Sequence, residues 1–477
     1  MGVIAFRVKL SDLTKLFSLR CNVEFFNPFS ESNTIINRLK SKYRVTKLRY
    51  LVKRISQGPH IRILDSIPNG DMGLITIENI GKFTIEIDHE NLHYVSPNIV
   101  NEKDLLKKND ILTPRVRGLG NISLVDEDDK YIASENVLFI RFNDKTFKNF
   151  EVKFLAYYLA TLGRLQIFLL QTGGKAGNIN QELLKEIVIP EVSLELQKKI
   201  VNDIEKIEAK IKKEKQKIFP LQEVIDDVFV KYGVKSEKFR KGEFELFTTD
   251  GLKIGMQKFL RCGVQYRAFW DVHDGLLFNG KIEYPVPKLG SLMRLHKTKT
   301  LKKGILDKEY VLIELEDIEQ KTGKILNMQR VVTEIGSDKT YFGDADLITT
   351  KLRPYLGYTI LNILDLEFIG TTELLPFKVN KDEVYPEYLK YVLLSHEYLE
   401  KSQFLMYGKE HPRIHPLDLL NIKISLPDLG IQQKIITEIQ KQEKINEEAK
   451  QKLNDYRKQI NDLIFDYLTN KEEITND

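Results

Sequence analysis

The sequence predicts a mixed α/β (α+β) chain of two similar domains in tandem, separated by two long, antiparallel, coiled-coil-forming helices with pseudo-two-fold symmetry. The first observation is an internal repeat: Tyr43–Leu48 returns as Tyr284–Leu289, and Gln197–Val201 returns as Gln432–Ile436. The repeat distance is roughly 240 residues, far longer than the period of about 20–50 residues in solenoids. The second observation is an amphipathic helical pattern that closes each copy. Two divergent copies of one unit therefore fill almost the whole chain, and they imply two similar, non-identical sites.

Both copies show the same order of predicted elements. Each begins with β-branched runs bounded by Gly, Pro and Asn, which indicate strands. A strand-like segment ending in basic residues follows, then an apolar run, a helix with apolar residues at helical spacing, a Gly-containing loop and a short strand ending in proline. In the first copy these segments are 110–117, 137–140, 152–168, 173–180 and 187–190, and in the second they are 346–353, 374–377, 386–399, 408–415 and 424–427.

A long amphipathic helix closes each copy, at 195–230 in the first and after 428 in the second. Its apolar residues recur at alternating spacings of four and three, the heptad pattern of a helix that packs against another helix. Pro220 predicts a kink or the start of a second helical segment. Two such helices in one chain most simply pair with each other; the alternative is that they are ordinary core helices of two separate domains. The predicted segments are 1–192, 193–234, 235–428 and 429–477.

Composition bounds the class of protein. Hydrophobic residues make up 42% of the 477 residues and charged residues 30%, as in soluble globular proteins. No apolar run reaches the roughly 18 residues of a membrane span, and the first ten residues do not form a signal peptide. The two cysteines, Cys21 and Cys262, occupy equivalent repeat positions and indicate small buried side chains. We therefore expect a cytoplasmic protein without a membrane partner. The net charge of +5 permits a nucleic-acid ligand without requiring one.

Two histidine pairs resemble metal sites. His89-Glu90-Asn91-Leu92-His93 matches the H-E-x-x-H pattern, which on a helix places two imidazoles beside a catalytic Glu. The flanking residues alternate like a strand, and the second copy has no counterpart. His411 and His415 are also four apart, but Pro412 and Pro416 disfavour a helix there. We predict no metal ligands and no catalytic residues in this chain.

Basic and amide-bearing residues at matched places of the two copies remain as candidates. Arg, Lys and Asn side chains can bind base edges and phosphates of nucleic acid. We expect the equivalent strands to present them to a duplex, and Arg117 and Arg353 to include a base-reading residue. The candidates are Arg115, Arg117, Lys175, Asn178 and Asn180 in the first copy, and Lys351, Arg353, Lys409, Arg413 and His415 in the second.

With these motifs in place, the chain resembles the specificity subunit of type I restriction–modification systems. The resemblance is carried by the last third of each copy: a glycine loop, an I-x-I-P strand and a Q-x-x-I helix start. In the first copy these are Gly173–Lys175, Ile187–Pro190 and Gln197–Ile200, and in the second Gly408–Lys409, Leu426–Pro427 and Gln432–Ile435. The second copy departs in that its proline lies two residues closer to its glutamine motif.

The resemblance implies a non-catalytic DNA-recognition subunit. Segments 1–192 and 235–428 would be target-recognition domains, each reading one half of a bipartite double-stranded DNA target. The helices would recruit two adenine methyltransferase subunits, and restriction subunits would complete the complex. No cofactor is expected in this chain, because S-adenosylmethionine, ATP and Mg would bind the partner subunits. The helix residues assigned to partner binding are Ile200, Ile204, Ile207, Ile211, Ile435, Ile439, Leu453 and Ile460.

Two alternatives of other classes remain open from sequence. One is a zinc-dependent hydrolase that uses His89, Glu90 and His93. The other is a coiled-coil scaffold that joins proteins without touching DNA. Metal analysis would distinguish the first, and a gel shift with duplex DNA would distinguish the second.

Overall fold

The computed structural model describes residues 31–61, 67, 70, 72–90, 92–172, 177–237, 264–278, 283–297, 299–362 and 367–470. The chain forms two compact units. Unit 1 combines Met1–Lys217 with Ala449–Asp477, and unit 2 is Ile218–Glu448. Each unit therefore joins one copy of the repeat to helical segments from both closing helices. The finer boundaries at 192, 234 and 428 stay predictions.

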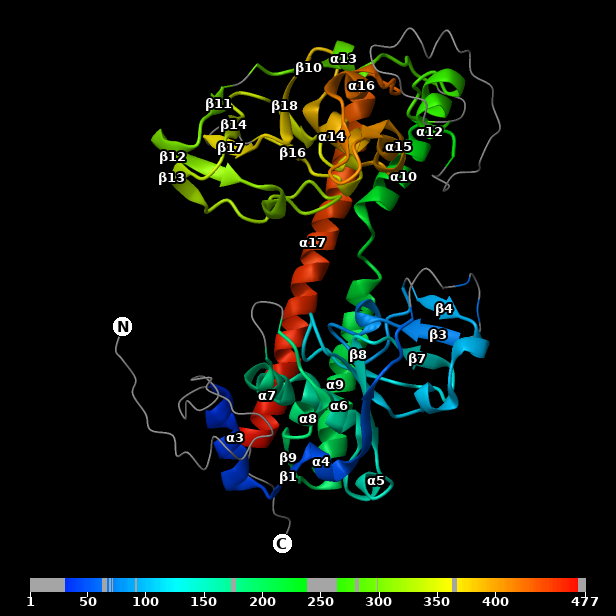
Figure 1. Ribbon diagram of the computed structural model, residues 1–477, viewed down its shortest axis with the longest axis vertical. Helices are drawn as coiled ribbons and strands as arrows, with labels where there is room; N and C mark the ends of the chain where they lie inside the picture. Colours follow the sequence, from blue (N-terminus) through cyan, green and yellow to red (C-terminus); the bar gives the residue numbers. More distant parts are fainter. Residues whose placement is uncertain are drawn as a thin grey trace. The chain divides into compact units, whose positions relative to one another are not determined.

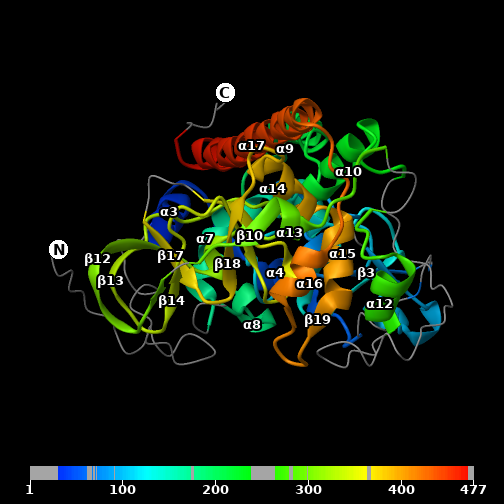
Figure 2. The same ribbon diagram turned by 90° about the horizontal axis from the view of Figure 1, so that it is seen from above.

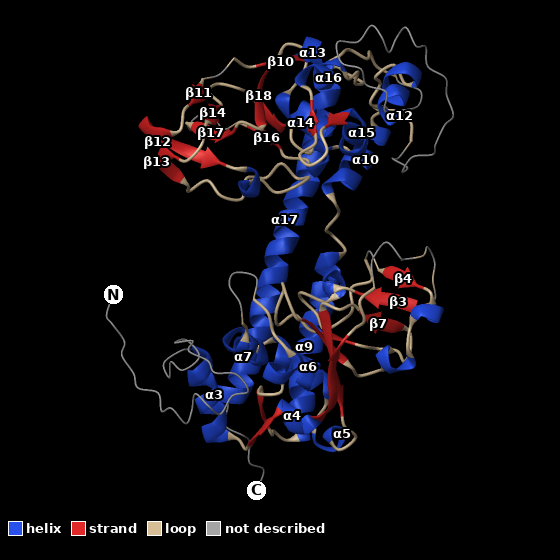
Figure 3. Cartoon of the chain, in the orientation of Figure 1, coloured by secondary structure: helices blue, strands red, loops and turns tan. Residues whose placement is uncertain are grey.

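Among its described residues, unit 1 contains a four-stranded sheet, a three-stranded sheet and the β1–β9 strand pair (Figure 1). The four-stranded sheet is antiparallel with the order β2–β8–β5–β6, and the three-stranded sheet has the order β4–β3–β7 with β3 and β7 parallel. In the orientation that Figures 1 and 3 share, α6 and α9 lie on one side of β8, which Figure 1 labels, and the three-stranded sheet lies on the other. The elements are α3 (Glu31–Lys42), β1 (Val45–Lys47), α4 (Leu48–Leu51), β2 (Val52–Gln57), β3 (Met72–Ile75), β4 (His93–Val95), β5 (Ile111–Pro114), β6 (Ser123–Leu124), β7 (Tyr131–Ala133), β8 (Val137–Phe142), α5 (Thr146–Asn149), α6 (Val152–Ala160), α7 (Leu162–Leu170), α8 (Gln181–Leu184), β9 (Val188–Pro190) and α9 (Leu194–Lys215).

Unit 2 repeats this plan. Its sheets have the orders β10–β18–β15–β16 and β11–β14–β17–β12–β13, and β19 pairs with β20. Figures 1 and 2 both place the five-stranded sheet at the opposite end of the unit from α12. The elements are α10 (Leu221–Lys231), α12 (Val264–Arg267), α13 (Leu289–Leu292), β10 (Met293–Leu295), β11 (Thr300–Leu301), β12 (Gly304–Ile313), β13 (Val331–Ile335), β14 (Lys339–Tyr341), β15 (Leu347–Thr350), η7 (Pro354–Leu356), β16 (Thr359–Leu361), β17 (Phe368–Thr371), β18 (Leu374–Val379), α14 (Pro386–Leu394), α15 (His396–Leu405), β19 (Met406–Tyr407), β20 (Arg413–Ile414) and α16 (Pro416–Asn421).

The topology confirms the repeat. The parallel β12–β17 pair of unit 2 matches the parallel β3–β7 pair of unit 1, and β13 takes the place of β4. Unit 2 adds β14 and β11 beyond β17. A buried carboxylate precedes the equivalent strands β5 and β15. Asp110 accepts two hydrogen bonds from Arg141, whereas Asp346 forms an ion pair of 2.7 Å with Lys381.

The predicted single helices at 152–168 and 386–399 are each two helices. The break falls at equivalent residues, Thr161 and Ser395. The Thr161 hydroxyl donates to the Tyr157 carbonyl at 2.7 Å, and the Ser395 hydroxyl accepts from the Tyr398 amide at 3.3 Å as the cap of α15. Such local hydrogen bonds compete with the helical pattern and end the helix. The apolar spacing continues across the break, so periodicity alone did not reveal it.

The strand predicted at 187–190 is confirmed as β9, but the one at 424–427 is wrong. In unit 1, β9 pairs antiparallel with β1. In unit 2 only two hydrogen bonds of that ladder remain, from the Ile424 amide to the Pro287 carbonyl and from the Leu426 amide to the Pro285 carbonyl. Proline has no amide hydrogen, so Pro285 and Pro287 cannot donate back across the pair.

The closing helices pair antiparallel within each unit. Helix α17 (Leu429–Phe465) supplies its residues up to Glu448 to unit 2 and its later residues to unit 1. In unit 1, Tyr467 donates to Asp203, and Lys452 lies 3.9 Å from Glu214. The later residue of the second closing helix thus contacts the earlier residue of α9, so the two helices run antiparallel. In unit 2, Pro220 is the N-cap residue of α10, which begins after a break in the predicted helix. The second helical segment is therefore confirmed. At this break, Asn446 bonds to both the amide and the carbonyl of Phe219.

Candidate nucleic-acid interface

In unit 1 the candidate residues gather where the chain leaves β5 and meets the segment before α8. Asn178 forms isolated bridges with Val116 and with Thr172. The Ile179 amide donates to the Arg115 carbonyl at 2.9 Å. The structure therefore brings together two stretches of the first copy that are well separated in sequence and that both carry candidate side chains.

Unit 2 repeats this pairing at equivalent positions. Leu352, after β15, forms an isolated bridge with Arg413 of β20. The Ile414 amide donates to the Lys351 carbonyl at 2.9 Å, as Ile179 does to Arg115 in unit 1. The repeated basic positions thus mark the same structural element in both copies, a turn after the third strand of the four-stranded sheet.

The two candidate arginines of this turn share an unusual backbone conformation. Arg117 has φ of 51° and Arg353 has φ of 45°, and both side chains are exposed. A left-handed residue other than glycine costs of order 1–3 kcal/mol and persists where the surrounding structure enforces it. In unit 2 the enforcing contact is a hydrogen bond from the Arg353 amide to the Pro412 carbonyl at 2.8 Å. The strain places an exposed arginine at the same position in each copy, and the Arg353 guanidinium donates from Nη2 to the Glu410 carbonyl at 3.2 Å.

Other candidate cations are held by partners that sequence reasoning missed. Arg115 donates from Nη1 to Oε1 of Gln57 at 2.7 Å. Arg413 donates from Nε and Nη2 to the two carboxylate oxygens of Glu373, at 2.9 and 2.8 Å, and Lys351 lies 4.0 Å from the same carboxylate. Hydrogen bonding to Arg413 lowers the pKa of Glu373 and keeps it charged. Gln57 ends β2 and Glu373 lies in the turn between β17 and β18, so no local spacing signalled them.

Two candidates serve as helix caps. The Asn180 side-chain oxygen accepts from the Leu183 amide at 2.9 Å and caps α8. His415, at the equivalent place, accepts from the Leu417 amide at 3.2 Å through Nδ1 and caps α16. A cap satisfies an amide that the helix leaves unpaired. These two side chains therefore have a structural role in addition to any contact with a ligand.

The remaining candidates differ in what surrounds them. Lys409 is exposed. The Asn178 side-chain oxygen is buried, and it has no hydrogen-bond partner among the described residues. Lys175 lies outside the described residues, as do Cys21 and Cys262. For the side chains of Arg117 and Lys409 and for the side-chain oxygen of Asn178, the structure shows no hydrogen bond to another described residue.

The geometry does not support the zinc alternative. His93 belongs to strand β4, and the described residues His89, Glu90 and Leu92 are not helical, so the two imidazoles do not share a helical face. His411 precedes strand β20 and His415 caps a helix. Among the described residues, no three His, Cys, Asp or Glu side chains cluster in a way that could hold a metal ion. In that part of the chain, no helix is long and apolar enough to cross a bilayer.

The apolar residues assigned to partner binding are buried within their own units. Their exposed fractions are between 0% and 9%, and Ile435 and Ile439 belong to the main core cluster of unit 2. They hold the closing helices against the α/β copies, so they are not surfaces that another subunit can reach. These residues are Ile200, Ile204, Ile207, Ile211, Ile435, Ile439, Leu453 and Ile460.

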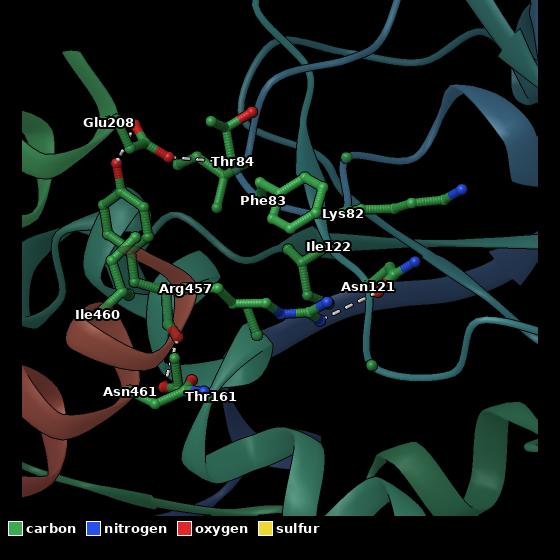
Figure 4. A pocket seen from close by; sticks show the side chains of 15 residues that line it. Lys82, Phe83, Thr84, Asn121, Ile122, Thr161, Glu208, Arg457, Ile460 and Asn461 are labelled. Atoms are coloured by element: carbon green, nitrogen blue, oxygen red, sulfur yellow. Dashed lines mark hydrogen bonds between the residues drawn. The ribbon is translucent and has the colours of Figure 1, made fainter. Parts of the chain in front are cut away.

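A small pocket shows how unit 1 joins its recognition copy to both helices (Figure 4). Glu208 of α9 accepts from the Tyr157 hydroxyl at 2.7 Å and from the Ile85 amide at 3.2 Å. Burial raises the pKa of Glu208. Across the pocket, Arg457 of α17 donates to the Asn121 side-chain oxygen at 3.4 Å. The loop that follows Arg117 is thereby connected to α17.

Comparison with known proteins identifies the repeated unit. The family model described as the type I restriction modification DNA specificity domain matches this chain twice, at residues 65–222 and 281–455. The two matches together cover more than half of the chain and fall one on each copy of the repeat.

Solved structures give similar matches over most of the chain. The S subunit of a type I restriction–modification system from M. genitalium is 14% identical, with a TM-score of 0.43, over 90% of this chain and 97% of that one. The HsdS subunit from Thermoanaerobacter tengcongensis is 14% identical, with a TM-score of 0.32, over 90% and 97%. A chain from a study of complex assembly and conformational transition of the type I R-M system is 14% identical, with a TM-score of 0.43, over 90% and 98%.

Proposed function

The chain belongs to the family of DNA specificity subunits of type I restriction–modification systems, and from that premise we propose how its two copies divide the work. Each copy reads one half of a bipartite duplex target through the turn that follows β5 or β15. The observation that carries this proposal is the repetition of a strained, exposed arginine, Arg117 and Arg353, at the same place in both copies.

The chain itself carries no catalytic step in this proposal. The titratable groups of the turns are engaged in ion pairs and caps, as in the Arg413–Glu373 pair and the His415 cap, rather than in a nucleophile–base arrangement. Restriction–modification chemistry belongs to partner subunits, which would hold S-adenosylmethionine, ATP and Mg. Two methyltransferase subunits and the restriction subunits are the partners, and the cytoplasm, where host DNA lies, is the place of action.

The partner subunits would contact the exposed faces of the closing helices. The apolar seam is buried, whereas lysines and glutamates line the outer faces of α9 and α17. The rim of a protein–protein interface is polar and solvent-accessible, so a mixed-charge helix face can form part of one. The repeat would give two equivalent binding sites, one on each closing helix, for two copies of one methyltransferase subunit.

Sequencing that detects methyladenine tests this function directly. The genome of the host would be mapped in the wild-type strain, in a strain that lacks this chain, and after it is supplied again. We expect one split motif, methylated in the first and third strains and unmethylated in the second. A continuous motif without an unread gap would contradict the assignment of one half to each copy. An unchanged methylation map would contradict the function as a whole.

A further inference from the structure

A basic groove lies on unit 1 next to the candidate interface and is not explained by the turn of Arg117. It is lined by α4, β2 and α8 with the residue that follows it, and Figures 1 and 2 both place α4 close to α8. The Arg49 amide donates to the Lys185 carbonyl at 3.1 Å, which joins the two sides. The lining residues are Arg49, Val52, Lys53, Arg54, Ile55, Glu182 and Lys185. Four of these are cations and one is a carboxylate.

The cations differ in how firmly they are held. Arg54 donates to the Lys103 carbonyl at 2.9 Å, and its guanidinium lies 5.1 Å from the Phe139 ring centroid, so its position is fixed. Arg49 is paired with Glu186. Lys53 is exposed and has no ion pair with a described residue. The groove therefore combines a fixed guanidinium with an uncompensated ammonium, which suits an extended polyanion.

The groove is continuous with the candidate interface at two points. Helix α8, which supplies Glu182, begins at its cap Asn180. Strand β2, which supplies Lys53, ends at Gln57, the residue that accepts from Arg115. Four residues of an extended strand span roughly 13 Å. That length corresponds to about four base-pair steps of duplex DNA at 3.4 Å each.

The second copy has lost this feature. The counterparts of Arg49 and Lys185 are Gly290 and Leu420. Arg294 pairs with Lys378 as Arg54 pairs with Arg141, so Arg294 is the counterpart of Arg54, whereas Lys53 is the extra residue at the irregularity of β2 and has no counterpart. The backbone arrangement is nevertheless the same, because the Leu289 amide donates to the Ile422 carbonyl as Leu48 donates to Ile187. A repeated backbone with one basic and one largely apolar lining indicates a role that only the first copy performs.

We propose that this groove binds the sugar-phosphate backbone of duplex DNA beside the half-site that unit 1 reads, and that unit 2 has no equivalent anchor. The inference rests on the proposed function, since it extends the same interface. Phosphate contacts fix register and orientation without reading sequence. The first half-site is thereby held by both a reading turn and a backbone anchor, and the second by its turn alone.

The test measures how binding to duplex DNA depends on salt, with the full chain in complex with its methyltransferase subunits. The probes are 30-bp duplexes of random sequence, because phosphate contacts do not depend on sequence. Lys53→Gln and Lys185→Gln should each lower the slope of log K against log salt by about 0.9, and the double variant by about twice that. Glu182→Gln should strengthen binding, because it removes the only carboxylate among the lining residues and releases Lys185 from its 2.7 Å pair.

Lys130→Gln is the charge-matched control. Lys130 is an exposed lysine of unit 1, paired with Glu127 at 2.9 Å outside the groove, and its loss should leave the slope unchanged. Equal slopes for the groove variants and this control would overturn the inference, as would unchanged or weaker binding by Glu182→Gln. Lys53 makes no contact that the fold requires, so its variant reports on DNA even if Lys185→Gln unfolds. Failure of the wild-type complex to prefer its methylated motif over random duplex would instead contradict the proposed function.

Discussion

Arg117 and Arg353 illustrate how a single residue can be placed by strain. Each sits in a left-handed conformation that an L-residue adopts only at a cost, and each follows a strand whose end is fixed by pairing with a distant loop. The planar fork of arginine can bind guanine at two atoms, whereas lysine offers a single charged point. Their chemistry and their conformation therefore favour base reading over simple charge compensation.

Replacing these arginines by lysine should separate the contribution of base reading from the contribution of positive charge. Arg117→Lys keeps the charge and should reduce discrimination at one target position by about 1–3 kcal/mol, with a smaller effect on random duplex. Arg353→Lys should act on the other half of the target. Titration against cognate and single-mismatch duplexes at two salt concentrations measures both effects. Arg117→Gly is the control for folding, because glycine adopts the left-handed conformation without strain. Wild-type discrimination in both lysine variants would show that these arginines are structural.

Gln197 and Gln432 explain why a glutamine recurs at the start of both closing helices. Both are fully buried. The Gln197 amide donates to the carbonyls of Asn149 and Val192 and accepts from the Glu151 amide. Gln432 makes the same three bonds in unit 2. Every polar atom of the side chain is satisfied by backbone, so the glutamine fixes the helix start against the α/β copy.

Removing this side-chain amide should loosen one unit at a time. Gln197→Met keeps the shape but leaves buried backbone groups unpaired, at about 1–3 kcal/mol for each orphaned group. Amide hydrogen exchange should then accelerate in α6 and α9 and remain unchanged in α14. Gln432→Met should give the reverse pattern. The exposed neighbour Gln433→Met is the matched control. Equal exchange in the control and in Gln197→Met would contradict this role.

At the scale of elements, the sequence predicted the order and the type of the helices and strands better than it predicted where a helix is interrupted. Apolar periodicity revealed the helices but not their breaks at Thr161 and Ser395, because a hydroxyl that bonds to nearby backbone leaves the apolar face intact. The matched basic residues lie at equivalent turns of the two copies, and their role in binding stays a prediction. Gln57, at the end of β2, and Glu373, in the turn before β18, are their partners, and only the folded sheet brings these residues near. Local patterns therefore located equivalent positions of the two copies, and tertiary contacts decide which partners each side chain has there.

The contact between α6 and α9 should depend on pH through Glu208. Burial raises the folded-state pKa of this carboxyl above its ordinary 4.5. A raised pKa means that the folded state binds the proton more tightly, so its contribution to stability is present below 4.5 and is lost as the pH rises through the folded value. The glutamine of Glu208→Gln carries no titrating group, so this fall with rising pH should be absent.

Unfolding of the wild type and of Glu208→Gln would be followed by hydrogen exchange in α9 from about pH 4 to 8. The variant should gain stability relative to the wild type as the pH rises. Tyr157→Phe removes one hydrogen-bond donor from the carboxylate, so its fall with pH should be steeper than in the wild type. Parallel profiles of all three proteins would mean that Glu208 does not titrate in this range.

At the scale of the whole molecule, two copies of one fold should be independent in specificity. Each unit contains its own sheets, its own reading turn and its own glutamine joint to a closing helix. The Gln197 side chain bonds to backbone atoms of the recognition copy and not to its side chains. A recognition copy can therefore diverge in sequence, and read different DNA, without losing its fit to the helix.

Exchange of residues 1–192 for the equivalent segment of a relative tests this independence. The junction precedes Ser193, the cap of α9, so Gln197 stays with the helix and finds the same backbone partners in the new domain. We expect methyladenine mapping to show a new first half-target, with the second half and the gap unchanged. Thermal unfolding of the chimera controls for folding. If both halves changed, the copies would read DNA jointly; if neither changed, the first copy would not read DNA at all. Because the joint consists of backbone hydrogen bonds, the chimera should also retain its methyltransferase subunits, which copurification would measure.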